Sequence, residues 1–78
     1  MKVKVLFFAR SREIVGEREI IFETKGSKVS DVINELIKRH PALGNMKFSV
    51  ALNRRFVRGD EMVREGDELA IIPPVSGG

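Results

Sequence analysis

Apolar and polar residues alternate at the start of the chain. The alternation has a period of two, which is typical of a β-strand that buries one face. The residues expected on the buried face are Val3, Val5 and Phe7. A second apolar cluster predicts another strand over residues 18–24. Since residues 2–9 and 18–24 are close in sequence, we expect them to pair as a hairpin, with an irregular or one-turn segment at 11–16.

A helical pattern follows. Apolar residues recur at the spacing of one helical face, namely Val29, Val32, Ile33, Leu36 and Ile37. Ser30 is the expected N-cap, and Asp31 lies in the first turn, where the helix dipole favours a negative charge. Pro41 ends the helix, and residues 41–45 are expected to form a loop.

Three more strands are expected in the second half of the chain. Residues 47–53 alternate again, with one face formed by Phe48, Val50 and Leu52. A turn at 53–55 leads into a short strand at 56–57. The last strand covers residues 68–72, with Leu69 and Ile71 facing inward. It stops at Pro73, because proline donates no ladder hydrogen bond.

This order of elements predicts an α+β fold. A single helix covers one face of a sheet, which gives two layers. The first and last strands are expected to be central, parallel neighbours, because the helix crosses over between them. That arrangement is the ubiquitin-like β-grasp, with a mixed sheet of four to five strands and one main helix. We expect residues 1–72 to form the domain and residues 73–78 a flexible tail.

Composition excludes several classes of protein. The 78 residues contain no cysteine and one histidine, so disulfides and thiolate metal sites are excluded and no metal is expected. The net charge is +3 and both signs interleave, which is unlike a nucleic-acid binder. The apolar run at 3–9 is too short for a signal peptide and is interrupted by Lys4, so none is expected. No apolar run approaches the roughly 20 residues of a membrane span. We therefore expect a cytoplasmic protein that binds neither nucleic acid nor membrane.

The strand pattern also predicts an apolar outer face. If positions 3, 5 and 7 face the helix, Leu6 and Phe8 face the other way, as do Ala70 and Ile72 of the last strand. Phe56, near a hairpin end, is a candidate to join them. Several large apolar groups on a face that water would otherwise cover indicate a partner surface. A sheet twist or bulge that buries one of them is the alternative.

The C-terminus carries the second candidate feature. The chain ends in Gly77 and Gly78, preceded closely by Pro73 and Pro74. Glycine has no Cβ, so such a backbone can enter a narrow channel and bring its carboxylate close to a reacting group. The prolines stiffen and project the tail. A frayed end or an expression remnant is the alternative for the glycines alone.

No catalytic set accompanies the tail. His40 lies beside a helix stop and is interpreted as a helix C-terminal cation or a solvated ring. Ser76 has no base within the tail to activate it. The arginines are interpreted as a solvated face, with docking to an acidic partner as the alternative; they are Arg10, Arg12, Arg54, Arg55 and Arg58. The chain is therefore expected to be a substrate or carrier for other enzymes.

Two segments carry a resemblance to a known family. They are Phe7-Phe8-Ala9-Arg10 with Arg12-Glu13, and Gly66-Asp67-Glu68 leading into Ile71-Ile72-Pro73-Pro74-Val75-Ser76-Gly77-Gly78. The whole chain resembles the small, sulfur-carrier subunit of molybdopterin synthase in length and element order. The terminal Pro-Pro-Val-Ser-Gly-Gly block is the more specific motif, since a bare Gly-Gly end would not distinguish this family.

The resemblance implies a chemistry for the tail. Gly78 would be adenylated with ATP by an E1-like adenylating enzyme and converted to a thiocarboxylate with sulfur from a sulfurtransferase donor. The tail would insert into the large subunit of the synthase through Pro73, Pro74, Val75, Ser76 and Gly77. Sulfur would then pass to cyclic pyranopterin monophosphate, which builds the dithiolene of molybdopterin. The chain itself would bind no cofactor.

The resemblance also implies partners. Two carriers would serve each dimer of large subunits, giving a heterotetramer whose catalytic residues belong to the large subunit. Positions matching Phe8, Phe56 and Ile72 would form the apolar contact, in agreement with the outer face predicted from the strand pattern. Two alternatives use the same Gly-Gly end: a sulfur carrier for thiamine biosynthesis and a ubiquitin-like protein modifier. A third is a β-grasp binding module with an incidental tail.

Overall fold

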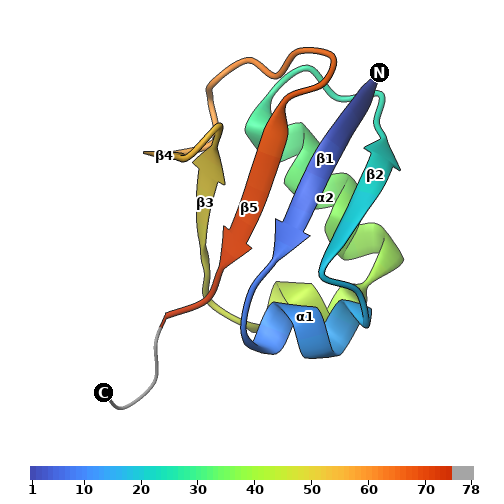
Figure 1. Ribbon diagram of the computed structural model, residues 1–78, viewed down its shortest axis with the longest axis vertical. Helices are drawn as coiled ribbons and strands as arrows, with labels where there is room; N and C mark the ends of the chain where they lie inside the picture. The colour runs from blue at the N-terminus through green and yellow to red at the C-terminus, as the bar shows by residue number, and fades with distance from the viewer. Residues whose placement is uncertain (75–78) are drawn as a thin grey trace.

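Five strands form one mixed sheet in the computed structural model, which describes residues 1–74 (Figure 1). They are β1 (Lys2–Phe7), β2 (Glu19–Glu23), β3 (Ser49–Leu52), β4 (Arg55–Val57) and β5 (Glu68–Ile72). Their order across the sheet is β2-β1-β5-β3-β4. The central pair, β1 and β5, is parallel, and the other pairs are antiparallel. The predicted β-grasp fold is confirmed.

Three helical segments accompany the sheet: α1 (Arg10–Val15), α2 (Val29–Arg39) and the 3₁₀ helix η1 (Pro41–Asn45). Helix α2 lies behind the sheet in Figure 1 and covers one face of it, while α1 and η1 lie at the end of the sheet from which the C-terminal segment leaves. Within residues 1–74, no helix combines the length and the apolar character that a membrane crossing requires.

The core lies between α2 and the sheet. Its fully buried side chains include Val3, Val5, Phe7, Val29, Val32, Leu36, Leu69 and Ile71, all of them expected from the sequence. Ile33, Ile37, Phe48, Val50 and Leu52 pack against them and are partly buried. Burial of apolar area at about 25 cal/mol per Å² is the main force that stabilises such a layer.

Two local predictions are wrong. Helix α2 begins at Val29 with Lys28 as its N-cap, two residues before the expected start, so Ser30 is not the cap. The reason is Asp31, whose carboxylate accepts the backbone N–H of Lys28 at 3.1 Å and that of Ser27 at 3.3 Å. Residues 41–45 form η1 instead of an irregular loop, because Leu43 is buried.

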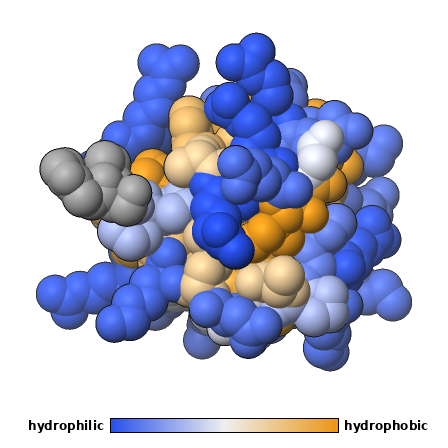
Figure 2. Space-filling model, turned by 90° about the horizontal axis from the view of Figure 1, so that it is seen from below, coloured by the Kyte–Doolittle hydropathy of each residue, from blue (hydrophilic) through white to orange (hydrophobic). Residues whose placement is uncertain are grey.

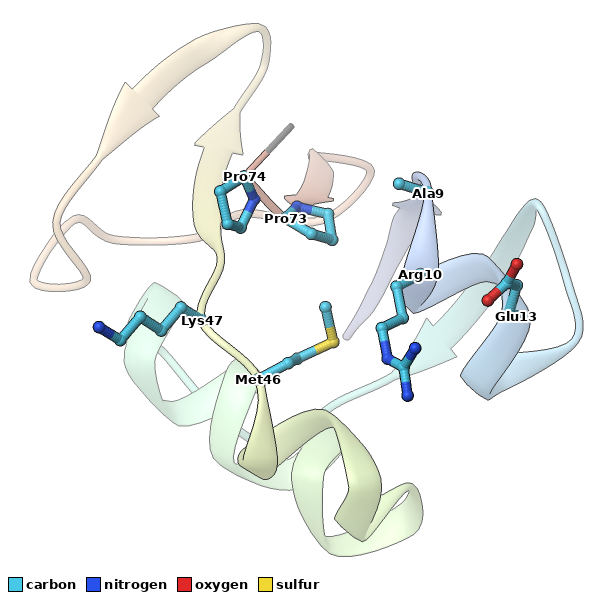
Figure 3. A pocket seen from close by; sticks show the side chains of 7 residues that line it. All are labelled: Ala9, Arg10, Glu13, Met46, Lys47, Pro73 and Pro74. Carbon is cyan, nitrogen blue, oxygen red and sulfur yellow. The ribbon is translucent and has the colours of Figure 1, made fainter. Parts of the chain in front are cut away.

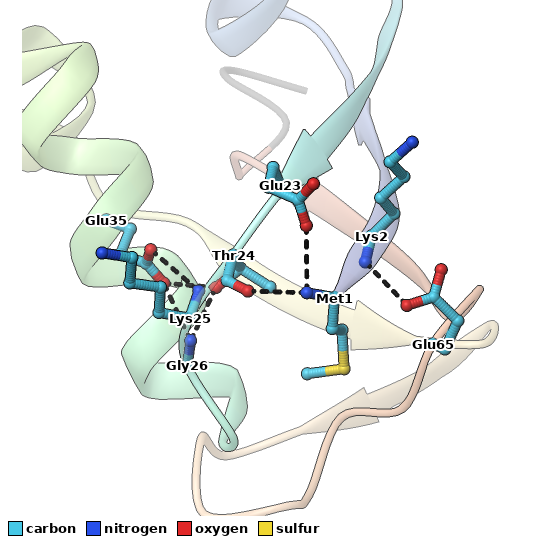
Figure 4. A network of polar contacts seen from close by, with 8 residues as sticks. All are labelled: Met1, Lys2, Glu23, Thr24, Lys25, Gly26, Glu35 and Glu65. Atoms are coloured by element: carbon cyan, nitrogen blue, oxygen red, sulfur yellow. Dashed lines mark hydrogen bonds and ion pairs between the residues drawn. The ribbon is translucent and has the colours of Figure 1, made fainter.

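The carboxylate of Glu35 holds the segment between β2 and α2 in place through hydrogen bonds (Figure 4). Glu35 of α2 accepts hydrogen bonds from the Thr24 hydroxyl and from the backbone N–H groups of Lys25 and Gly26. The hydrogen bond from Thr24, followed by those from the two N–H groups, lowers the pKa of Glu35 against the opposing effect of burial.

Candidate functional site

The two central strands, β1 and β5, end side by side, at the end of the sheet from which the C-terminal segment leaves (Figure 1). Phe7 of β1 is in register with Ile71 of β5, and the N–H of Phe8 donates to the carbonyl of Ile71 at 3.2 Å. Phe8 and Ile72 are the next residues along each strand. They therefore lie near each other at the root of the tail, as the sequence predicts.

An apolar hollow of about 380 Å³ lies on the sheet face opposite α2. We call it the outer patch, and its lining residues are Leu6, Phe8, Ala51, Arg54, Phe56, Glu68, Ala70 and Ile72. Phe8 is 40% exposed and Phe56 is 72% exposed. The alternation predicted from the sequence is confirmed, because Leu69 and Ile71 are buried beneath α2 and their neighbours line the hollow.

Two alanines form the floor of the outer patch. Ala51 of β3 and Ala70 of β5 are directly opposite each other in the sheet. They are only 5% and 7% exposed, although they face away from the core. Because their side chains are small, the larger groups around them leave a depression into which a partner side chain can fit.

A short turn fixes the backbone of Phe8. The hydroxyl of Ser11, which is fully buried, donates to the carbonyl of Phe8 at 2.7 Å and accepts its N–H at 3.0 Å. Arg12 donates from Nε to the carbonyl of Phe7 at 3.2 Å and is half-buried, so its interpretation as a solvated arginine is wrong. Ala9, which directly follows Phe8, has a φ of 52°. Sequence reasoning missed these supports; the signal available was a serine three residues after the phenylalanine.

A second hollow, of about 590 Å³, lies at the root of the tail (Figure 3). This tail-root cleft is lined by Ala9, Arg10, Glu13, Met46, Lys47, Pro73 and Pro74. In Figure 3 the Met46 side chain points into the space below the two prolines, with Arg10 on one side and Lys47 pointing outward on the other. Viewed from below in Figure 2, apolar side chains occupy the middle of this end of the molecule, between hydrophilic ones.

The two prolines differ in exposure. Pro73 is buried and Pro74 is exposed. The predicted domain boundary after residue 72 stays a prediction, with Pro73 held against the body of the domain. The remaining tail residues, Val75, Ser76, Gly77 and Gly78, lie outside the described residues, so the roles assigned to them also stay predictions.

The other charged candidates are spread over the surface. Arg10, Arg54, Arg55 and Arg58 are exposed, as expected. His40 is the C-cap of α2, and its backbone N–H donates to the carbonyl of Leu36 at 2.8 Å. Within residues 1–74, no group of three or more His, Cys, Asp or Glu side chains is placed to hold a metal ion.

Taken as a surface, the outer patch is suited to binding. It presents two aromatic rings and one arginine, which are residue types enriched in protein interfaces, beside aliphatic side chains and Glu68. Its position beside the last described residue of the tail means that a protein bound to the patch also lies next to the tail.

Known proteins are similar to this chain in both sequence and fold. The model of the family described as "ThiS family" matches residues 5–78. The molybdopterin synthase sulfur carrier subunit of Chlamydomonas reinhardtii is 48% identical over an 83-residue alignment that covers all of both chains. The protein of the same name from Homo sapiens is 39% identical, over 99% of this chain and 94% of its own.

Among solved structures, SAMP1 (small archaeal modifier protein 1) from Haloferax volcanii superposes with a TM-score of 0.87. It is 30% identical and the match covers all of both chains. A chain of this fold is therefore found among proteins named as sulfur carriers and among proteins named as modifiers.

Proposed function

Because the chain belongs to the ThiS family, we propose that it is the sulfur-carrier subunit of a molybdopterin synthase. The observation that carries the proposal is the 48% identity, over the full length of both chains, to a curated carrier subunit of that enzyme. The alignment extends to the end of the chain and so includes its Gly-Gly terminus.

In the proposed reaction, Gly78 is the reacting residue. Its carboxylate attacks the α-phosphorus of ATP within an E1-like adenylating enzyme, and pyrophosphate leaves. A sulfurtransferase donor then supplies sulfur at the oxidation level of sulfide, which attacks the acyl carbon of Gly78, breaks its bond to AMP and leaves a thiocarboxylate. Glycine suits this step because a terminus without Cβ is unhindered.

The body of the chain positions that tail. The large subunit of the synthase binds the outer patch, with Phe8, Phe56 and Ile72 as contacts, and receives residues 73–78 in its active site. Two carriers and two large subunits form the heterotetramer. Support comes from the exposed rings of Phe8 and Phe56 and from the nearness of Phe8 and Ile72 to the tail root.

A reconstitution tests this function. The thiocarboxylated chain, mixed with the large subunit and cyclic pyranopterin monophosphate, should yield molybdopterin, while the carboxylate form should yield none. If the thiocarboxylated chain gives no product with an active large subunit, the assignment to molybdopterin synthesis is wrong.

The second candidate function is protein modification. It is favoured by the full-length structural match to a small archaeal modifier protein. In that function the activated Gly78 would form an isopeptide bond with a lysine of a target protein. Lysine-linked Gly78 remnants in peptides from cells that express the chain would support it, and their absence alongside active sulfur transfer would exclude it.

A further inference from the structure

Three non-glycine residues in the described part of the chain have positive φ: Ala9, Asn53 and Arg54. Two of them form the turn between β3 and β4. Leu52 and Arg55 are directly paired, so the turn has two central residues, with φ of 50° at Asn53 and 71° at Arg54. Such a turn favours Asn-Gly, because a Cβ is strained at its second position.

Asn53 has a structural reason to occupy the turn. Its side-chain amide donates to Asp67 at 3.1 Å, and its side-chain oxygen accepts the N–H of Glu68 at 3.0 Å. Asparagine also tolerates positive φ better than most residues. The first position of the turn is thus explained by the fold.

Arg54 has no such reason. Its guanidinium forms no hydrogen bond or ion pair with any residue of the described chain, and its side chain is exposed. Its backbone conformation is strained where glycine would relax it. Strained residues that the fold does not require are concentrated at functional sites.

The position of Arg54 indicates what that site is. The side chain lines the outer patch together with Phe8, Phe56 and Ile72. Glu68 lines the same hollow, yet no ion pair joins it to Arg54. A guanidinium beside exposed aromatic rings is a common centre of binding energy in protein interfaces.

We propose that Arg54 is a partner-binding residue of the outer patch, retained despite its strained backbone because its guanidinium binds a carboxylate of the partner. The partner segment therefore combines an acidic residue with apolar side chains that fill the hollow between Phe8 and Phe56. Arginine suits this task because its planar fork can hold a carboxylate through two parallel hydrogen bonds. The inference rests on the proposed function, which supplies the large subunit of molybdopterin synthase as the partner.

The test combines stability and affinity in the same variants. Arg54→Gly and Arg54→Asn remove the guanidinium and relieve the turn, so we expect each to raise the Tm, Arg54→Gly by roughly 2–5 °C. Titration calorimetry against the large subunit should show an about tenfold weaker Kd at low salt, with a smaller loss at high salt. Arg54→Lys keeps a positive charge and the strained backbone, so its Kd should lie between that of the wild type and those of the other two variants.

Arg55→Ala is the matched control. Arg55 is the next residue, is also exposed, and does not line the outer patch. It should change the Kd by less than about twofold.

Each outcome decides the proposal. A wild-type Kd retained in both Arg54 variants overturns the role of Arg54 and leaves the proposed function intact. A Tm lowered in both variants overturns the claim that the turn is strained. If the wild-type chain itself does not bind the large subunit, the proposed function fails and the partner assigned to Arg54 fails with it.

Discussion

Phe8 and its neighbour Phe7 have opposite environments although they are the same residue type. Phe7 is fully buried beneath α2, whereas Phe8 is 40% exposed on the outer patch. Successive side chains of a strand point to opposite faces, so one position along the chain separates a core residue from a surface residue. A ring that is 40% exposed at the root of the tail offers apolar area to a partner.

Replacing Phe8 with Asp tests this difference at the level of a single residue. We expect the Tm measured by circular dichroism to change by less than about 4 °C, because the ring is partly in water already. The affinity for the large subunit should fall at least about tenfold, since a buried interface would then hold an unpaired charge.

Phe7→Ala is the matched comparison, and it should cost about 3–5 kcal/mol of unfolding free energy. A similar loss of stability in Phe8→Asp would place Phe8 in the core and remove it from the partner surface.

At the level of elements, the periodic elements could be predicted, whereas features fixed by a single capping or packing contact could not. The strands β1 and β5 and the apolar face of α2 followed from periods of 2 and 3.6, because burial on one face imposes those spacings. The start of α2 depends on Asp31 reaching back to the N–H groups of Ser27 and Lys28, and η1 depends on the burial of Leu43. Neither feature repeats along the chain, so neither leaves a periodic signal.

The stabilising effect of Glu35 on the link between β2 and α2 should depend on pH. The folded protein lowers the pKa of Glu35 from its ordinary value of 4.5, chiefly through the hydrogen bond from Thr24. A carboxylate whose pKa is lowered on folding stabilises the folded state at pH values above its ordinary pKa. That stabilisation is lost as the pH falls through the pKa that the carboxylate has in the folded state. Glu35→Gln should therefore lower the Tm by roughly 2–5 °C at pH 7.

The difference between wild type and Glu35→Gln should shrink steadily below the ordinary pKa of the carboxylate. Glu17→Gln is the control, because Glu17 is exposed and has no hydrogen bond of its side chain within residues 1–74. Thermal melts across a pH series measure both variants. An equal Tm difference at neutral and acidic pH would show that Glu35 acts by shape and not by charge.

At the scale of the whole molecule, the proposed function requires a folded platform and a reactive tail. The outer patch could be predicted because alternation fixes both faces of a strand once one is assigned. The strain at Arg54 could not be predicted, since it requires the backbone dihedral angles of the turn. Nor could the burial of Pro73, because it depends on how the end of the last strand lies relative to α1 and Met46.

Deleting Gly78 separates the two parts of the molecule. The buried hydrophobic core is formed by residues between Val3 and Ile71. The Tm of the deletion variant should therefore lie within about 2 °C of the wild type, because a glycine has no side chain to bury. A deletion that unfolds the protein would contradict the division into platform and tail.

The most direct measurement is the intact mass of the chain after incubation with its activating enzyme, ATP and a sulfur source. The proposed function predicts that the wild-type chain gains the mass expected for replacement of one oxygen by sulfur, assigned to Gly78 by fragmentation, and that the Gly78 deletion gains nothing. A wild-type chain that acquires neither sulfur nor any other adduct at Gly78, with an activating enzyme proven active on another carrier, would contradict it.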